Sequence, residues 1–190
     1  KILDKDLAEK MGVSRTPVRE ALRRLEDKQL VESAANRWTR VAEIPIREPE
    51  MIYPIIWTLE ELAIGQALAN LTEEDFQRME RANQALGEAL AEADPVKASS
   101  ADAQFHDIFI ERSGNHSLIN ILQDLKIRYR RVEVTYFEGS ACASDSFAEH
   151  CGILEALRAL DLDRLRSLIR LNWQNSLKRL QQIERRTDND

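Results

Sequence analysis

Asp102, His106, Glu149 and His150 are the side chains in this sequence best suited to chemistry. Asp102 and His106 are four residues apart in a segment of helical period, so a helix would present both on one face. His150 follows Glu149 in a later helical segment. Aspartate and histidine are good ligands for Zn, Ni or Mn ions, so a divalent metal site is a candidate. A surface Asp/His pair would show the same spacing.

The same four residues also fit a different class of protein. With an open coordination position on the metal to activate water, they would serve a metal-dependent hydrolase. This alternative predicts an enzyme, whereas the N-terminal part of the chain points to another function.

Composition indicates a folded protein with its positive charge at one end. The chain has 190 residues, 43% of them hydrophobic, which allows a small domain and a larger one. The net charge is −6, but residues 1–43 hold 10 Lys and Arg against 8 Asp and Glu. Cys142 and Cys151 lack C-x-x-C spacing, and no apolar run reaches membrane length. We therefore expect a cytoplasmic protein that does not associate with a membrane.

Apolar positions three and four apart dominate the chain, so we predict a mainly α fold. The exception is a short hairpin expected within residues 30–44. Two prolines then mark a linker at 45–50. Residues 51–185 are predicted to form an antiparallel bundle of about six helices, followed by a polar tail at 186–190.

The N-terminal residues have the pattern of a helix-turn-helix. Gly12 supplies a turn after a short amphipathic helix, and Ser14 is placed to cap a second helix with Pro17 in its first turn. The polar residues Ser14, Arg15, Thr16 and Arg19 then cluster at the start of that helix, where backbone N–H groups attract phosphate and arginine can bind guanine. A solvated helix face is the alternative.

The run Gly-Val-Ser-Arg-Thr-Pro-Val-Arg-Glu-Ala-Leu at 12–22, with Asp6-Leu7-Ala8-Glu9 before it and Leu30-Val31 after it, resembles the winged helix-turn-helix of GntR-family regulators. This resemblance implies a DNA-binding domain over residues 1–44, truncated because its N-terminal helix is absent. The wing is implied at 30–41, with DNA contacts from Lys5, Ser14, Arg15, Thr16 and Arg19.

The wing departs from the family at its tip. The family often has Gly-Arg-Gly, whereas this chain has Asn36-Arg37-Trp38. Arg37 remains a candidate for the minor groove. Trp38 does not supply the conformational freedom of glycine, so a packed tryptophan is the alternative.

The residues Asp102 to His106, Ser113-Gly114-Asn115 and Glu149-His150 resemble the FCD effector domain of the FadR subfamily, and six helices suggest its VanR-like branch. In metal-binding members, an aspartate and three histidines hold a divalent ion that helps to capture a carboxylate effector. The resemblance assigns three of these positions to Asp102, His106 and His150. Asn172 occupies the fourth, where an amide oxygen is a weaker ligand for zinc-like ions.

Three arginines on one predicted helix are candidates to bind the effector's carboxylate. Arg130 is the representative of this group, which also includes Arg128 and Arg131, and a solvated helix face is the alternative.

The resemblance as a whole implies a homodimeric repressor that binds operator DNA and is relieved by a small carboxylate. Besides the hydrolase, a DNA-binding dimer without ligand sensing remains an alternative, and Asn172 is its best support.

Overall fold

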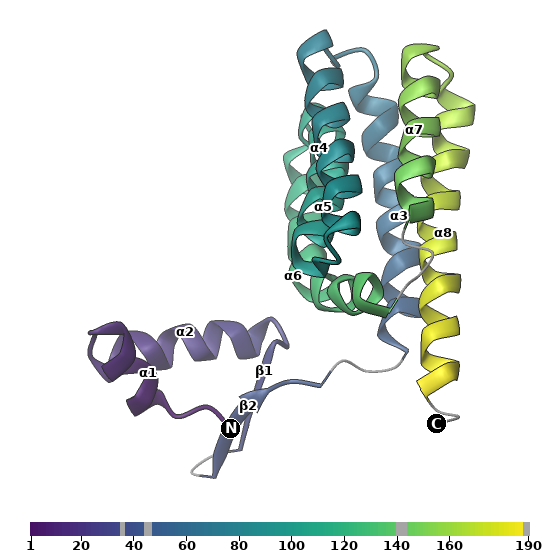
Figure 1. Ribbon diagram of the computed structural model, residues 1–190. Coiled ribbons are helices and arrows are strands. Elements are labelled where there is room, and N and C mark those ends of the chain that lie inside the picture. Colours follow the sequence, from purple (N-terminus) through teal and green to yellow (C-terminus); the bar gives the residue numbers. More distant parts are fainter. Residues whose placement is uncertain (35–36, 44–46, 140–143, 188–190) are drawn as a thin grey trace. The chain divides into compact units, whose positions relative to one another are not determined.

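The computed structural model describes residues 1–34, 37–43, 47–139 and 144–187, and it divides the chain into two compact units, Lys1–Ile46 and Arg47–Asp190 (Figure 1). Each unit buries apolar side chains of its own, such as Val18 in the first and Phe105 in the second. No helix among the described residues is long and apolar enough to cross a membrane.

The first unit opens with two short helices joined by a tight turn. Helix α1 (Asp4–Met11) ends at Gly12, whose φ of 68° is left-handed and favours glycine. Helix α2 (Arg15–Asp27) follows, with Val18 buried against the rest of the unit. Ser14 occupies the N-cap position with an extended backbone, but its side chain makes no capping hydrogen bond. The predicted N-cap position of Ser14 is therefore confirmed, but its hydroxyl does not supply a capping hydrogen bond.

A two-stranded hairpin completes the first unit, as the sequence predicts. Strands β1 (Val31–Ala34) and β2 (Trp38–Val41) pair antiparallel. Trp38 is only partly buried, and the guanidinium of Arg40 lies 4.7 Å from its ring centroid. The indole is thus covered by a neighbouring cation and not enclosed in the core. Asn36, in the expected wing tip, lies outside the described residues.

The described part of the second unit contains six helices, as expected: α3 (Glu48–Ala67), α4 (Glu73–Ala91), α5 (Pro95–Arg112), α6 (His116–Gly139), α7 (Ser144–Arg158) and α8 (Leu162–Thr187). Local sequence explains their starts. Thr72 and Asp75 form a capping box before α4. Asp94 accepts a hydrogen bond from the Lys97 N–H at 3.0 Å, and Pro95 occupies the first turn of α5.

Helix α3 begins earlier than the expected end of the linker at residue 50. Pro49 lies in its first turn, where a proline has no hydrogen bond to lose. The Glu48 side chain is buried and accepts hydrogen bonds from Arg128 Nε at 3.1 Å and Nη2 at 2.6 Å. This contact from α6 holds the first turn of α3 in place, so the second proline of the expected linker starts a helix.

Helix α5 has a central position in the second unit. It packs against α3, α4 and α6, while α7 packs against α4 and α8, and α3 lies alongside α8 (Figure 1). Tyr53 of α3, Tyr129 of α6 and Trp173 of α8 meet edge to edge, with ring centroids 5.1 to 6.1 Å apart. Side chains on the inner faces of α5 and α7 are thereby enclosed.

Candidate metal centre and DNA-reading face

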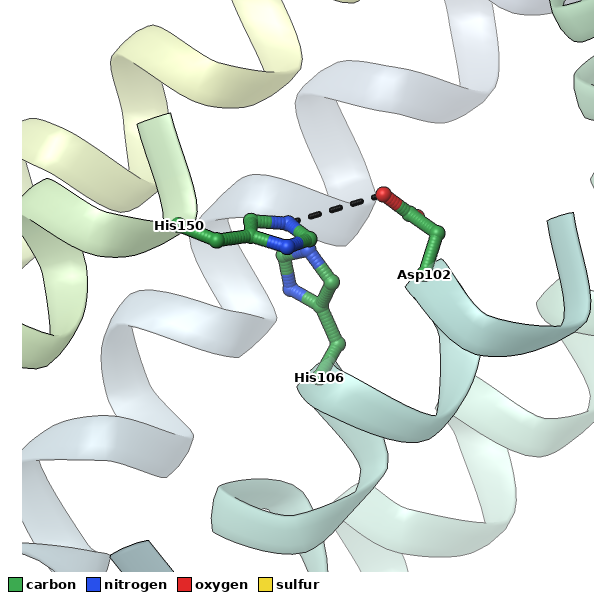
Figure 2. A group of neighbouring side chains, drawn as sticks. All are labelled: Asp102, His106 and His150. Atoms are coloured by element: carbon green, nitrogen blue, oxygen red, sulfur yellow. Dashed lines mark ion pairs between the residues drawn. The ribbon is translucent and has the colours of Figure 1, made fainter. Parts of the chain in front are cut away.

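Asp102, His106 and His150 form a buried cluster between α5 and α7 (Figure 2). Asp102 and His106 lie one turn apart on α5, and His150 faces them from α7. One ligand atom from each residue lies within 4.8 Å of the other two, and His150 Nε2 is 3.5 Å from Asp102 Oδ1. Ligand atoms that share one ion at about 2.1 Å lie about 3 to 4 Å apart, so small side-chain movements would close the set around a metal.

A carboxylate from α3 orients the His106 ring. His106 Nδ1 lies 2.8 Å from Glu60 Oε2, and Trp173 Nε1 donates to the same oxygen at 2.7 Å. The carboxylate accepts hydrogen bonds, so Nδ1 carries the ring proton and Nε2 is left with a lone pair when the ring is neutral.

An amide from α4 orients the His150 ring in a similar way. Asn83 Nδ2 donates to the Phe147 carbonyl at 3.1 Å, which directs Asn83 Oδ1 to the ring. His150 Nδ1 lies 3.1 Å from this oxygen and donates to it. The ring also stacks on Phe105, with centroids 3.9 Å apart and planes 2° from parallel. Both histidine rings are therefore held through Nδ1, the arrangement typical of metal-binding histidines.

Both inward nitrogens of the cluster lack a hydrogen-bond partner. Among the described residues, His106 Nε2 and His150 Nε2 are buried without a hydrogen bond, and His150 Nε2 has only the 3.5 Å contact with Asp102 Oδ1. Leaving a buried polar atom unpaired is costly, and a metal ion bound to both atoms would satisfy them. The donor set of two imidazoles and one carboxylate therefore fits a divalent ion of the zinc type.

Burial and the Glu60 charge set the protonation of this cluster. Burial raises the pKa of Asp102 to about 6, although the charge on His106 opposes this. Burial lowers the pKa of His150 well below its ordinary value, and the neighbouring His106 adds to the effect. Burial acts to lower the pKa of His106 too, but the Glu60 carboxylate outweighs it and raises that pKa. His150 is therefore neutral at pH 7 and ready to donate its lone pair.

Asn172 is buried on α8, where its amide nitrogen is already engaged. Nδ2 donates to Glu149 Oε2 at 2.8 Å, so Oδ1 is the atom that Asn172 has to offer an ion. Glu149 also accepts from Arg179 Nη1 at 3.0 Å and from Asn175 Nδ2 at 2.9 Å. Glu149 thus ties α7 to α8, so one of the four residues that the hydrolase alternative would use is engaged in a structural contact.

The candidate arginines for an effector are not equivalent in the structure. Arg130 is exposed on α6, and Arg128 is bound to Glu48. Arg179, which no sequence pattern singles out, has a side chain that is only 11% exposed, and its buried Nε has no hydrogen-bond partner among the described residues.

Glu60 and Asn83, which orient the two histidines, are not among the residues predicted from the sequence. Glu60 lies on the apolar face of α3, between the buried Ile56 and Ile64. A lone carboxylate in an apolar stripe was the available signal, because a buried charge needs a partner. No comparable local pattern marks Asn83.

A second set of candidate residues lies around the start of α2. Ser14, Arg15, Thr16 and Arg19 are exposed there, and Lys5 is exposed on α1. Side chains able to contact DNA are thus gathered at one end of a helix, whose free N–H groups also favour phosphate.

An open hollow of about 520 Å³ lies beside this end of α2, within the first unit. Its lining includes Arg15 and Arg19 from α2 and Arg37 and Trp38 from the hairpin. Arg37 of the wing and the two arginines of α2 therefore line one hollow, although the sequence separates them.

A winged helix-turn-helix followed by a helical domain with a buried Asp/His cluster defines a ligand-responsive transcription regulator. Residues 2–41 match the family described as bacterial regulatory proteins, gntR family, and residues 52–175 match the FCD domain. The chain belongs to the GntR family of transcription regulators, in the group that carries an FCD domain. It is a DNA-binding regulator and not an enzyme. Members of this family bind operator DNA, and they bind small-molecule effectors through the FCD domain.

Relatives over most of the chain are transcription regulators as well. McbR of Escherichia coli is 30% identical over 128 residues, which are 67% of this chain and 58% of McbR. The solved structure of E. coli McbR/YncC has a TM-score of 0.85 at 27% identity and covers 95% of this chain and 86% of that one. YdhC of Bacillus subtilis, an uncharacterized HTH-type transcriptional regulator, is 21% identical over 96% of this chain and 82% of its own length.

A third relative carries a more specific description. The probable D-xylose utilization operon transcriptional repressor of Paenarthrobacter nicotinovorans is 27% identical over 160 residues, 84% of this chain and 70% of that protein.

Proposed function

We propose that the chain is a cytoplasmic, homodimeric repressor that holds a divalent metal ion in its FCD domain and releases its operator when a small carboxylate binds there. Asp102, His106 and His150 would be the metal ligands, with Asn172 Oδ1 in the fourth position. The observation that carries this proposal is the convergence of two buried, unpaired histidine Nε2 atoms on one aspartate.

The two imidazole nitrogens favour zinc or nickel over calcium or magnesium, which prefer oxygen ligands. Manganese also fits the site, because the aspartate and the amide supply the oxygen ligands that it prefers. A divalent ion held by three protein ligands keeps a fourth coordination position for a carboxylate oxygen, and an ion that also binds Asn172 would take that oxygen as a fifth ligand. The chain's own residues supply the orientation, since Glu60 and Asn83 fix the two rings through Nδ1.

On the DNA side, we propose contacts from Lys5, Ser14, Arg15, Thr16 and Arg19, with Arg37 of the wing directed to the minor groove. Pairing two such readers in a homodimer would match a two-fold operator. The exposure of these side chains and the inclusion of Arg37 in the same hollow support this assignment.

Release of the operator by an effector follows from how a sensor domain acts on a dimer. A ligand bound among the FCD helices favours the conformation that binds it better. If that conformation changes the spacing or orientation of the two DNA-binding domains, they fit one operator less well. The repressor name of the Paenarthrobacter relative supports this direction of control.

Metal analysis of the purified full chain tests the proposal. After metal-supplemented expression, we expect about one zinc, nickel or manganese ion per chain, and His106→Ala and His150→Ala should each abolish it. His116→Ala is the matched control, because His116 is the third histidine of the chain and is exposed at the start of α6. If the purified chain contains no metal and binds none when metal is added, the proposed metal centre is wrong.

A ligand screen separates the sensor from a dimer without ligand sensing. Small mono- and dicarboxylates are added to the metal-loaded chain, and thermal unfolding and operator binding are recorded. At least one acid should raise the unfolding temperature and release DNA. No response to any acid, in a chain that binds its operator, would favour the dimer without sensing.

A further inference from the structure

One carboxylate in the first unit holds both arginines of the proposed reading helix. Arg15 Nη2 donates to Asp4 Oδ1 at 2.9 Å and to Oδ2 at 3.0 Å, and Arg19 Nε donates to Asp4 Oδ2 at 2.6 Å. Asp4 is the first residue of α1, and the arginines lie one turn apart on α2. The three hydrogen bonds therefore connect the two helices of the helix-turn-helix.

These bonds leave some donors of each guanidinium unused: Nε and Nη1 of Arg15, and Nη1 and Nη2 of Arg19. A guanidinium has five N–H donors, and neither arginine has another hydrogen-bond partner among the described residues. Arg19 contacts Asp4 through Nε, so its terminal pair Nη1 and Nη2 is open. That pair is the fork that fits guanine O6 and N7 or two phosphate oxygens.

Both arginines also stay exposed while Asp4 holds them. Their side chains are 53% and 64% exposed, against 22% for Asp4. Asp4 thus leaves more than half of each arginine side chain open to solvent. Hydrogen bonds from Arg19 and then Arg15 hold the pKa of Asp4 below its ordinary value, so the carboxylate remains charged when the protein binds DNA.

We infer that Asp4 is a positioning residue for operator recognition: it fixes the guanidinium groups of Arg15 and Arg19 so that their free donors face the DNA. The inference rests on the proposed DNA contacts of these two arginines. A long arginine loses rotamer freedom when it binds, and a side chain already held by Asp4 loses less. This fixed placement of the two arginines should raise the affinity for the operator and not the general affinity for DNA.

The inference gives Asp4 an effect opposite to that of its charge alone. A carboxylate beside DNA repels phosphate, so neutralising it should strengthen binding to any sequence. If Asp4 also positions the arginines, Asp4→Asn should bind non-specific DNA at least as well and should lose operator affinity. The informative quantity is the selectivity ratio, the dissociation constant for non-specific DNA divided by that for the operator.

The experiment uses the full chain and an operator fragment selected with the unsubstituted protein from random-sequence duplexes, with poly(dI-dC) as non-specific DNA. Asp4→Asn should lower the selectivity ratio about tenfold, the value of one well-placed arginine contact. Asp6→Asn is the matched control, because Asp6 is exposed in the same first turn and carries the same charge. Its ratio should stay within about twofold of the unsubstituted value.

A conservative variant checks that the carboxylate itself is responsible. Asp4→Glu keeps the charge and can still reach both arginines. It should therefore keep at least about half of the selectivity that Asp4→Asn loses. A ratio for Asp4→Glu as low as that of Asp4→Asn would overturn the inference, and thermal unfolding of each variant shows that the first unit is folded.

Arg19→Ala separates failure of the inference from failure of the proposed function. If Arg19→Ala leaves operator binding unchanged, the proposed contact of Arg19 is wrong. If Arg19→Ala weakens binding while Asp4→Asn and Asp6→Asn give equal ratios, the contact stands and the positioning role of Asp4 is overturned. With Arg19→Ala already present, Asp4→Asn should lower the ratio less than it does alone.

Discussion

His106 Nδ1 lies 2.8 Å from Glu60 Oε2 in the interior of the FCD domain, and this contact leaves Nε2 as the ring nitrogen available to Asp102 and His150. The other Glu60 oxygen, Oε1, is buried without a hydrogen-bond partner, and Lys126 Nζ lies 3.9 Å from it. A fully buried carboxylate needs positive charge nearby. Positive charge on His106, from a proton or from a bound ion, would provide it.

The first prediction concerns this carboxylate. Glu60→Gln keeps the size of the side chain but removes the charge that makes His106 a better ligand, so metal affinity should fall about 10- to 100-fold. Competition with a chromogenic chelator measures the change. Glu61→Gln is the matched control, because the neighbouring Glu61 binds Arg170 of α8 and not a histidine. Equal affinities for the two variants would contradict a role for Glu60 in the metal site.

The second prediction concerns the fourth ligand position. Asn172→His would supply an imidazole where the chain has an amide oxygen, and zinc binding should tighten by about 1.4 kcal/mol, or tenfold. Asn175→His on the same helix is the control, because Asn175 also donates to Glu149 but is not at the assigned position. If Asn172→His binds zinc no more tightly than the unsubstituted chain, residue 172 does not contact the ion.

Local patterns in the sequence predict the helices, but they predict only part of the candidate metal site. Asp102 and His106 are found from their spacing, because a helix dictates which side chains share a face. His150 is a candidate by residue type, but only the family resemblance places it in one site with them. Glu60 and Asn83 lie 46 and 67 residues from the histidines that they orient. No spacing rule reaches that far, since the packing of α3 and α4 against α5 and α7 creates these contacts.

At the start of α3, too, local sequence alone does not determine the structure. A proline at residue 49 is compatible with either a linker or a first helical turn. The contact that decides between them is made by Arg128, 80 residues away from Glu48. Tertiary packing therefore selects one of two local structures that the sequence allows.

The third prediction concerns acid stability of the helical domain. Burial acts to raise the pKa of Asp75, but hydrogen bonds from Arg112 and Thr72 outweigh it and hold this pKa below its ordinary value of 3.8. Arg112 Nε lies 2.8 Å from Asp75 Oδ2, and the Thr72 N–H donates to the same oxygen at 2.9 Å. A lowered pKa means that the folded state favours the charged carboxylate. Asp75 thus stabilises the fold above its unfolded pKa and loses this effect as the pH falls through the lower, folded value.

Asp75→Asn should accordingly lower the free energy of unfolding at pH 7 by about 1 to 2 kcal/mol, as expected for a lost helix cap. The difference from the unsubstituted chain should persist down to about pH 5 and shrink below pH 4. Thermal unfolding in the presence of a chelator measures it without interference from metal. Glu74→Gln, in the same turn but exposed, is the control. A deficit of Asp75→Asn that stays constant down to pH 3 would contradict the role of the charge.

The fourth prediction concerns what Arg15 reads. If its guanidinium contacts a base, Arg15→Ala should weaken operator binding by about 1 to 3 kcal/mol and relax the preference at one position. If it contacts a phosphate, binding should weaken for all sequences alike, and the slope of log K against log salt should fall by about one. Titrations at several salt concentrations, with operator variants at each position, distinguish the two outcomes.

Arg24→Ala is the matched control for this prediction. Arg24 is an exposed arginine in the last turn of α2, so its removal changes the charge of the same helix without touching the N-terminal end. Because the proposed DNA contacts lie at that end, Arg24→Ala should weaken binding less than Arg15→Ala and leave base preference intact. An Arg24→Ala defect equal to that of Arg15→Ala would show that the charge of α2 as a whole governs binding, and that its N-terminal end has no special part in reading DNA.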